Sequence, residues 1–597
     1  MDKWKALEIN KTEDREKNPE WVNILLTAIN AKYIHSNLAV YSIQAYAKKQ
    51  GQHVELAEYT INQQFEVVIR DIYNQKPDVL CFSCYIWNIE YVRELVVEFH
   101  KLKPEIPIWL GGPEVSFRTE EFLRDNPAVT GIMVGEGEET FLRLCQYYQN
   151  QEDSDDLKLE EIAGIVWRDG NGEINTNPAA GTLDLDLLPF CYESLKHFEN
   201  QIIYYESSRG CPFSCSYCLS SVDKHMRLRS LSLVYPELQF FLDGRVPQVK
   251  FVDRTFNCNH EHALGIWRYI LEHDNGVTNF HFEISADLLN EEELAVLSAM
   301  RSGLVQLEIG VQSTNQDTIR EIRRVMNLER LKAVVQHIKA GMNIHQHLDL
   351  IAGLPNEGYD SFRRSFDEIY RLKPEQLQLG FLKVLKGSYM YDMAENYGLI
   401  YRDKPPYEVM ATKWLSYEEI QRIKLVEDML EIHYNSGQFL RTLTILECQF
   451  DSPFDMFFGL ACFYRENGRE DMNYTRLARA EILYRFAVQT DPVHEELYGE
   501  ALLFDLYIRE KAKARPGWAP EHAAYNRQIG QTLKSLGYEK KYCHVEMFHY
   551  AVYDIYPRTM LRDAADITHV DEPQWILFDY EHRNPLNREA KIKAIQS

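Results

Sequence analysis

The sequence predicts an α/β protein in three parts: an N-terminal doubly wound domain, a central partial (βα)6 barrel and a mostly helical C-terminal domain. Short apolar runs alternate with amphipathic helical stretches in two separate regions, which is typical of parallel sheets covered by helices. After about residue 400 the pattern becomes mostly helical, aromatic and charged. We expect a polar tail over residues 1–20, the first domain over 21–150, a linker over 151–200, the barrel over 201–400 and the C-terminal domain over 401–597.

The first alternation predicts an open parallel sheet. Its expected strands are Val22–Thr27, His53–Tyr59, Val79–Tyr85, Ile108–Leu110 and Gly131–Val134, and its expected helices are Leu38–Gln50, Phe65–Asn74, Ile89–Leu102 and one starting at Glu138. Ligands of such sheets bind at the carboxyl ends of the strands. The acidic, loop-like residues that follow, within 151–200, suggest a hairpin and a linker.

The second alternation predicts six strands with helices between them. They are Gln201–Glu206, Val249–Asp253, Asn279–Ile284, Leu304–Gly310, Asn343–Leu350 and Gln376–Val384. Six βα units are too few for a closed eight-fold barrel but suit an open one. In the C-terminal region we expect helices, one strand at Trp575–Tyr580, and a position that closes the mouth of the barrel.

Composition excludes several classes of protein. The chain has 597 residues, with 65 Lys and Arg against 90 Asp and Glu, a net charge of −25 that disfavours a broad nucleic-acid surface. It contains no run of about 18 apolar residues, so we expect no membrane span. The first residues are polar and do not resemble a secretory signal. Eleven cysteines are too few for a disulfide scaffold, so we expect a cytoplasmic protein with reduced thiols.

The strongest motif is Cys211-Pro-Phe-Ser-Cys215-Ser-Tyr217-Cys218. Three thiolates on a loop directly after a strand suit a four-iron cluster in which one iron is left open. Two other interpretations are three incidental cysteines or half of a zinc site. Zinc usually requires a second pair of ligands nearby, and only Cys258 and His260 follow.

CxxxCxΦC with an aromatic residue before the last cysteine, in a chain with six βα units, resembles the radical S-adenosylmethionine (SAM) superfamily. The resemblance implies that Cys211, Cys215 and Cys218 hold a [4Fe-4S] cluster. The amino and carboxylate groups of SAM would chelate the fourth iron. One electron from the cluster would then cleave SAM to methionine and a 5′-deoxyadenosyl radical.

The same resemblance implies a set of SAM contacts near the strand ends. Asp253 stands where the superfamily often has a Gly-Gly-Glu run. The superfamily's GxIxGxP segment is resembled by Asp349-Leu-Ile-Ala-Gly353-Leu-Pro355. Its adenine-facing LxVLPGT strand is resembled by LKVLKGS, with Lys386 in place of Pro. The implied contacts are Tyr217, Asp253, Glu283, Glu308, Gln312 and Gly353. Taken singly, each acid could equally be a solvated or structural charge.

Two glycine motifs in the first domain, LGGPEVSF and VGEGEETF, follow buried strands. Glycine at a strand end lets backbone approach a ligand without a Cβ in the way, although tight turns would look the same. Ahead of a radical SAM core, these motifs resemble the cobalamin-binding domain of the cobalamin-dependent radical SAM class. The implied contacts are Ser83, Gly111, Gly112, Pro113, Gly135, Glu136 and Gly137 around the nucleotide tail, and Ser36, Asn37 and Tyr85 near the corrin.

His35 lacks the surroundings of a cobalt ligand. Cobalamin mutases carry DxHxxG, whereas His35 has no Asp two residues before it and no Gly three residues after it. A neutral imidazole can still bind cobalt. The resemblance nevertheless implies cobalamin with no protein histidine on the cobalt.

The resemblance implies an enzyme, and methylation of an unactivated carbon is its leading activity. The radical would remove hydrogen from the substrate, methylcobalamin would deliver the methyl group, and a second SAM would remethylate the cobalamin. The alternatives are anaerobic radical cyclisation or oxidation, as in magnesium-protoporphyrin ester cyclases, and a non-catalytic cobalamin or redox sensor. The electron donor would be a protein such as flavodoxin or ferredoxin, and the substrate stays unknown.

Overall fold

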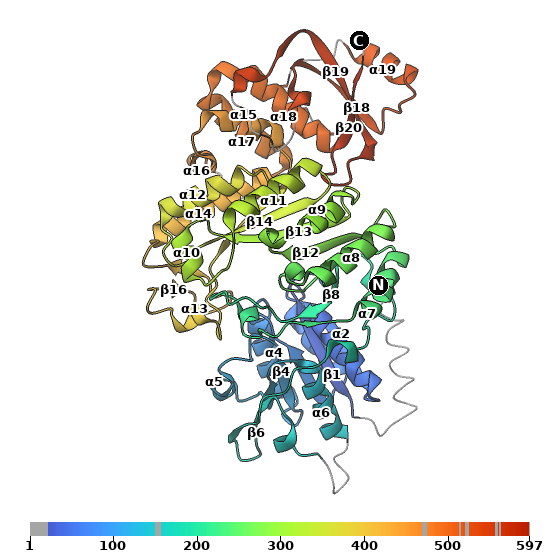
Figure 1. The fold of residues 1–597 in the computed structure, drawn as a ribbon, viewed down its shortest axis with the longest axis vertical. Coiled ribbons are helices and arrows are strands. Elements are labelled where there is room, and N and C mark those ends of the chain that lie inside the picture. The colour runs from blue at the N-terminus through green and yellow to red at the C-terminus, as the bar shows by residue number, and fades with distance from the viewer. Residues whose placement is uncertain are drawn as a thin grey trace.

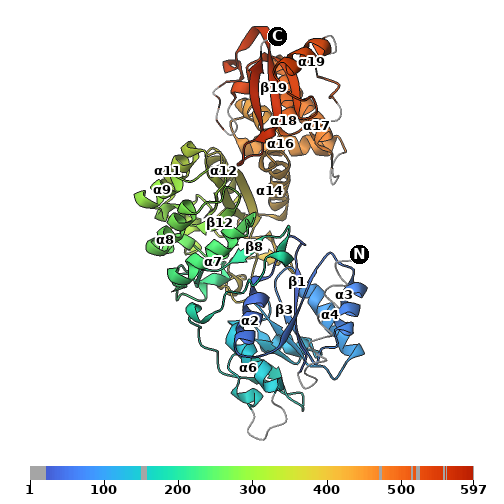
Figure 2. The ribbon, with the colours of Figure 1, turned by 90° about the vertical axis from the view of Figure 1, so that its right-hand side faces the viewer.

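The computed structural model describes residues 22–149, 157–468, 474–512, 515–519, 525–555, 559, 561 and 563–595; the polar tail expected over 1–20 lies outside them. The chain forms three bodies along one long axis, with the N-terminal and C-terminal bodies at opposite ends in both views (Figures 1 and 2). Among the helices of the described ranges, none has the length and apolar character that a membrane crossing requires.

A seven-stranded sheet forms the N-terminal body, in the order β2-β1-β3-β4-β5-β6-β7. The first five strands are parallel, and β6 and β7 add an antiparallel hairpin at one edge. The strands are β1 (Ile24–Asn30), β2 (Val54–Thr60), β3 (Val79–Ser83), β4 (Ile108–Gly111), β5 (Gly131–Met133), β6 (Ile165–Arg168) and β7 (Ile174–Thr176). The helices are α2 (Leu38–Lys49), α3 (Phe65–Asn74), α4 (Ile89–Leu102), α5 (Thr119–Asp125) and α6 (Gly137–Gln149).

Alternate residues of β1 explain why this sheet has helices on both faces. Leu26 and Ala28 belong to the apolar cluster that includes residues of α2 and α6. Leu25 and Ile29 belong to a second cluster with residues of α3, α4 and α5. A strand buried on both faces reads as a continuous apolar run, which is why the doubly wound fold was predictable, and the structure confirms it.

The central body is a six-stranded parallel sheet in the order β15-β14-β13-β12-β11-β8. The strands are β8 (Ile203–Tyr205), β11 (Gln248–Phe251), β12 (Asn279–Ile284), β13 (Val305–Gln312), β14 (His345–Ala352) and β15 (Gln376–Phe381). The helices between them are α7 (Leu231–Asp243), α8 (His260–Glu272), α9 (Glu291–Ser298), α10 (Gln316–Glu321), α11 (Leu328–Gly341) and α12 (Tyr359–Tyr370). All six expected strands are present, which confirms the partial barrel.

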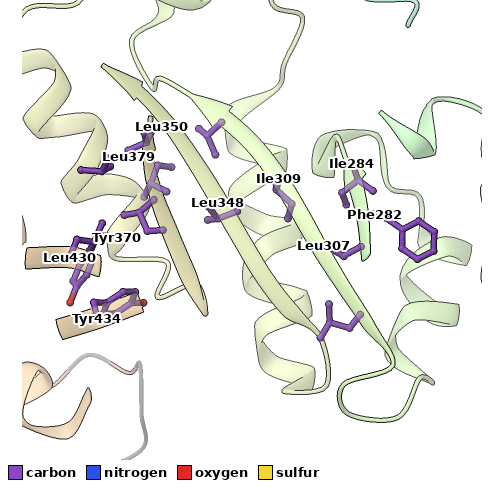
Figure 3. Packing of buried hydrophobic residues seen from close by; sticks show 14 of the residues in the cluster. Phe282, Ile284, Leu307, Ile309, Leu348, Leu350, Tyr370, Leu379, Leu430 and Tyr434 are labelled. Atoms are coloured by element: carbon purple, nitrogen blue, oxygen red, sulfur yellow. The ribbon is translucent and has the colours of Figure 1, made fainter. Parts of the chain in front are cut away.

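One face of these strands is apolar and packs against the helices. Phe282 of β12 contacts Trp267 of α8 edge-on, with ring centroids 5.9 Å apart. Figure 3 shows Phe282 with other side chains of this cluster, including Leu307 of β13 and Leu348 of β14. Because side chains alternate along a strand, the residues between these apolar positions face the inside of the barrel.

Both edges of the open barrel are covered. At β15, the amide of Leu377 donates to Oδ1 of Asn435 (3.0 Å), and Nδ2 of Asn435 donates back to the carbonyl of Leu377 (2.8 Å). On the β8 side, the amide of Ile202 donates to the carbonyl of Ile34 in the N-terminal body (2.8 Å). These contacts satisfy backbone groups that an exposed edge strand would leave free to pair with another chain.

The C-terminal body contains helices and a three-stranded antiparallel sheet, β18-β19-β20. Before it, α13 (Tyr389–Asp392), β16 (Ile400–Tyr401) and β17 (Val409–Ala411) follow β15 and lie beside the barrel, toward the N-terminal body (Figure 1). The elements that follow are α14 (Tyr417–Met429), η7 (Leu430–Asn435), α15 (Leu440–Leu446), α16 (Pro453–Glu466), α17 (Arg476–Thr490), α18 (Glu495–Arg509), α19 (Asn526–Ser535), β18 (Cys543–Tyr550), β19 (His569–Arg583) and β20 (Ala590–Ile595). The predominance of helices was expected, and the expected strand lies within β19.

Only a short part of this region lies at the carboxyl end of the barrel, where Val409 of β17 packs against Gly353, which follows β14. Its η7 helix packs on the β15 edge, where Tyr434 lies beside Tyr370 of α12 (Figure 3). A Cβ on Gly303, which precedes β13, would contact Pro585 of the C-terminal body. The later part of the region, from η7 onward, therefore covers an edge and the amino-terminal end of the barrel.

Candidate active site

The loop with the three cysteines follows β8 and is closed at its base. The short antiparallel strands β9 (Ser208–Arg209) and β10 (Arg227–Leu228) hold its two ends together. Gly210 has a φ of 95°, and a Cβ there would collide with the backbone of His225, so the approach requires glycine. The amide of Cys211 donates to the carbonyl of Asp223 across the same base (3.0 Å).

The three thiols lie together beside two guanidinium groups. Cys211 and Cys215 are buried, Cys218 is half-buried, and no disulfide joins any cysteine of the described residues. Burial raises the pKa of the Cys215 thiol, Arg324 opposes this rise, and the other two thiols add to it. Arg254 acts electrostatically on Cys218 and Cys211. Three converging sulfur donors next to positive charge fit a cluster held by three thiolates.

Gln312 ends β13 in a conformation that few residues adopt. Its φ is 72°, and the pairing of β13 with β14 shifts register between Gly310 and Gln312. Its Oε1 atom is buried and accepts no hydrogen bond from the described residues. Such strain at a strand end is typical of ligand-binding positions. An acceptor without a donor suits a SAM hydroxyl or amino group, as the sequence predicts.

Two other predicted SAM contacts are occupied by the protein itself. Asp253 is 1% exposed, and its carboxylate accepts the amide and hydroxyl of Ser207 (3.0 and 2.6 Å) and the hydroxyl of Ser208 (2.6 Å). Gly353 has a φ of 90°, and a Cβ there would lie 2.6 Å from Val409 of β17. Asp253 is thus held under the cysteine loop and Gly353 packs against β17, and their contacts with SAM stay predictions.

The remaining predicted SAM contacts are Tyr217 in the cysteine loop, Glu283 on β12 and Glu308 on β13. Tyr217 is half-buried in the cysteine loop, and burial raises the pKa of its hydroxyl. Glu283 lies 3.5 Å from the guanidinium of Arg254. Glu308 lies deeper inside the barrel, where Nζ of Lys250 donates to its Oε2 (3.1 Å). Their contacts with SAM stay predictions.

The predicted cobalamin residues mostly gather at the carboxyl end of the N-terminal sheet. Ser83 and Gly111 are register partners at the ends of β3 and β4, and Tyr85 stacks on Trp87 with ring centroids 4.4 Å apart. Pro113 and Gly135 lie in the loops of the same edge, and Gly137 begins α6. Gly112 is different, because a Cβ there would lie 2.5 Å from the carbonyl oxygen of Cys84. Its glycine is therefore required by the backbone of the neighbouring loop.

Glu136 forms ion pairs that join the first two bodies. Its carboxylate accepts Nη1 of Arg227 (3.0 Å) and lies 3.3 Å from Arg209. Arg209 also pairs with Glu138 (2.9 Å) and Glu206 (2.7 Å). Although burial opposes it, the guanidinium groups keep the pKa of both Glu136 and Glu138 below the usual range. We call Glu136, Glu138, Glu206, Arg209 and Arg227 the interdomain ion-pair cluster.

The loop after β1 makes a second link between the bodies. Ser36 donates to the carbonyl of Ile202 (2.8 Å), and Nδ1 of His35 lies 2.7 Å from the hydroxyl of Tyr204. Asn37 is buried just before α2. Burial and Lys32 lower the pKa of His35, so its ring is neutral near pH 7. Ser36 therefore serves the domain contact, and His35 has one ring nitrogen committed to Tyr204.

Sequence reasoning missed several charged residues of this region, namely Lys250, Arg254, His281, Arg324 and His347. Arg254 lies after β11 and Arg324 lies in the loop after α10, where the direction of a side chain depends on the fold. A signal was present for the others, because His345, His347 and Asp349 alternate along a strand whose intervening residues are apolar or buried. Such a period of two places polar groups on one face.

Comparisons with known proteins agree with this geometry. Residues 24–145 match the B12 binding domain family, residues 205–369 match the Radical SAM superfamily, and residues 395–578 match a family described as protein of unknown function (DUF4080). The chain therefore contains a B12 binding domain followed by a radical SAM domain, the combination that its motifs resemble. Its last part matches a family without a described function.

Its relatives include methyltransferases and cyclases. The chain is 27% identical over 318 residues to 2-(S-pantetheinyl)-carbapenam-3-carboxylate methyltransferase of Streptantibioticus cattleyicolor, covering 48% of this chain and 44% of that protein. It is 24% identical to the cobalamin-dependent radical SAM methyltransferase TokK of Streptomyces tokunonensis, over 79% of this chain and 72% of TokK. It is 22% identical to the anaerobic magnesium-protoporphyrin IX monomethyl ester cyclase of Rubrivivax gelatinosus, over 49% of this chain and 54% of the cyclase.

Solved structures show the same fold. The cobalamin-dependent SAM radical enzyme OxsB, with aqua-cobalamin and SAM bound, aligns with a TM-score of 0.54 at 17% identity, over 82% of each chain. The radical SAM methyltransferase TsrM from Kitasatospora setae aligns with a TM-score of 0.52 at 15% identity, over 65% of this chain and 82% of TsrM.

Proposed function

We propose that this protein is a methyltransferase that acts on an unactivated carbon and uses cobalamin, SAM and a [4Fe-4S] cluster. One observation carries the proposal: the interdomain ion-pair cluster joins the carboxyl end of the N-terminal sheet to the base of the cysteine loop. Cofactors of both domains bind at such strand ends, so this contact would bring them to one shared space.

The residues of the site have distinct roles in this proposal. Cys211, Cys215 and Cys218 hold the cluster, and Arg324 beside Cys215 favours the thiolate form. Gln312 and Tyr217 bind SAM, together with Glu283. When bound, the cluster supplies the electron that splits SAM, and cobalamin carries a methyl group from a second SAM to the substrate.

The cobalamin site would use the edge formed by Ser83, Gly111 and Gly135 for the nucleotide tail, and the stacked pair of Tyr85 and Trp87 for the corrin. A Cβ on Gly135 would meet nothing within 4 Å, so this glycine faces open space. We propose that His35 does not bind cobalt, because the Asp and Gly of the DxHxxG motif are absent around it.

We further propose that the protein works in the cytoplasm and takes electrons from a flavodoxin or ferredoxin. Both follow from the chemistry of the cluster, which requires a low-potential donor and a reducing compartment. Mixing the oxidised holoenzyme with reduced flavodoxin or ferredoxin and following the cluster absorbance tests the donor. No reduction by either protein would contradict that part of the proposal.

Product analysis tests the reaction. The holoenzyme is reduced with SAM present, and S-adenosylhomocysteine and 5′-deoxyadenosine are measured with and without candidate substrates. A methyltransferase consumes SAM in two ways and should release both products in comparable amounts with its substrate. Deoxyadenosine alone, while substrate is consumed, would instead support a cyclase, and neither product would support a sensor.

Variants locate the chemistry in the cysteine loop. Cys215→Ala should lose the cluster iron and all deoxyadenosine. Cys462→Ala, which removes a half-buried thiol of α16 far along the chain, should keep both. Retention of iron in Cys215→Ala would exclude the assigned cluster site.

A further inference from the structure

Inside the central barrel, one imidazole and two carboxylates, those of His347, Glu308 and Asp349, form a cluster that the proposed function leaves without a role. Glu308 of β13 and His347 of β14 are register partners, and Asp349 follows on the same face of β14. One ligand atom from each of these three residues lies within 4.8 Å of the other two. The residues come from neighbouring strands, so the sheet fixes their separation.

The imidazole groups lie close to carboxylates without the alignment of hydrogen bonds. Nε2 of His347 lies 3.0 Å from Oδ1 of Asp349, and Nε2 of His281 lies 3.0 Å from Oε2 of Glu308. Both histidines are more than nine-tenths buried, at 7% and 6% exposure. Neither nitrogen, nor Oδ1 of Asp349, has a hydrogen bond of acceptable geometry with any residue in the described ranges.

This arrangement is typical of atoms directed at a common third position. Two ligand atoms that are each about 2.1 Å from a metal ion, at right angles, lie about 3.0 Å apart. The observed separation of Nε2 of His347 from Oδ1 of Asp349 equals this value. A hydrogen-bonded pair at the same distance would instead place the oxygen on the N–H axis.

The interior holds more carboxylates than fixed positive charges. Glu308 and Asp349 contribute two carboxylates, and the ammonium of Lys250 beside Glu308 contributes one fixed positive charge, so the second carboxylate depends on a protonated His347 or on a bound cation. Glu283 adds a further acid at the upper end of β12, where it faces Arg254. Buried charge without a partner is costly, so a cation among these groups would stabilise the folded barrel.

We propose that Glu308, His347 and Asp349 bind a divalent first-row transition metal ion, separate from the iron of the cluster. Imidazole nitrogen excludes ions that require an all-oxygen site, and the lack of sulfur excludes soft ions such as Cu(I). His281 and Lys250 contact the Glu308 carboxylate and hold it in position. Three protein ligands leave coordination positions for water or for an oxygen of the substrate.

Cobalt binding tests this site in the full-length chain, reconstituted with its cluster so that the three loop thiols are occupied, and prepared without cobalamin, whose own cobalt would otherwise be counted. The protein is equilibrated with Co²⁺ in excess Mg²⁺ and desalted, and cobalt and iron are counted in the same samples. We expect about one cobalt per chain in addition to about four iron. Wild-type protein without stoichiometric cobalt would overturn the proposal.

Three variants identify the ligands. His347→Gln and the isosteric Asp349→Asn should each weaken cobalt binding at least about tenfold while iron stays constant. His337→Gln, on the exposed face of α11 behind the same sheet, is the matched control and should bind like the wild type. Cobalt that stays bound in both His347→Gln and Asp349→Asn would also overturn the proposal, because it would lie at another site. The result does not depend on which reaction the enzyme performs.

Discussion

The interdomain ion-pair cluster should be energetically significant, and Arg209→Met tests it. The Arg209 side chain is only 18% exposed and faces Glu206, Glu138 and Glu136 at 2.7, 2.9 and 3.3 Å. Removing one partner of a buried ion pair costs about 3–5 kcal/mol, because the remaining charge stays buried without compensation. Methionine keeps most of the side-chain volume, so the loss should be mainly electrostatic.

An exposed ion pair provides the control. Arg268 and Glu292 also pair between two helices of the barrel, but their side chains are 48% and 61% exposed. Solvent screens such a pair, so Arg268→Met should cost about 0–1 kcal/mol. Urea unfolding of the cofactor-free proteins, followed by fluorescence and circular dichroism together, measures the difference in the transition that both probes share.

A double-mutant cycle with Glu138→Gln isolates the pairwise contribution. Glu138 is 5% exposed, so neutralising it should remove much of the penalty that Arg209→Met creates. The double variant should therefore lose at least about 1 kcal/mol less than the sum of the single variants. Strictly additive losses, or an Arg209→Met variant as stable as Arg268→Met, would refute the argument that this cluster couples the two bodies.

Three further predictions follow from single residues. Burial raises the pKa of Asp253 to about 6, so the folded state binds the proton of this carboxyl more tightly than the unfolded chain does. The free energy of unfolding should therefore fall by about 3 kcal/mol as pH rises from about 4 to about 6. Melting curves of Asp253→Asn should lack this fall, and its affinity for SAM should be unchanged. Asn435→Leu removes both hydrogen bonds that cover β15, so it should cost about 1–3 kcal/mol of stability and speed amide exchange at Leu377. The surface variant Asn396→Leu should do neither. Amide exchange at Leu377 that is equally fast in the two variants would contradict the edge-covering role of Asn435. Gly112→Ala should destabilise more than Gly135→Ala in thermal melts, because both positions have a left-handed φ but only Gly112 would place its Cβ against backbone; similar losses would contradict the steric argument.

Much of the architecture was predictable because the strands are buried on both faces or on one face with clear alternation. The six barrel strands have this pattern, and each lies between helices with one apolar side. The edge strands β18 and β20 were missed. CHVEMFHY and AKIKAI become strands by pairing with β19, and no local pattern in the short final segment predicts that partner.

The site was predictable only where its residues are adjacent in the chain. Cys211, Cys215 and Cys218 form one local motif, so their proximity needed no knowledge of the fold. The role of Asp253 was not predictable, because its hydroxyl partners are 45 and 46 residues away in the sequence. The same holds for Glu136, whose partner Arg227 is 91 residues away and belongs to another domain.

The inside of the barrel shows how a functional surface can be read from strand alternation alone. An inward-facing position in a closed apolar core would carry Val, Ile or Leu, as barrel interiors usually do. Here the inward positions carry Lys250, His281, Glu308, His347 and Asp349. Burying these groups is unfavourable unless they are compensated, so they would not be kept for packing. The two candidate sites therefore differ in how they can be found. A local sequence motif predicts the site of the loop thiols. The proposed metal site of Glu308, His347 and Asp349 is found only from the period of two along several strands together with the register of those strands.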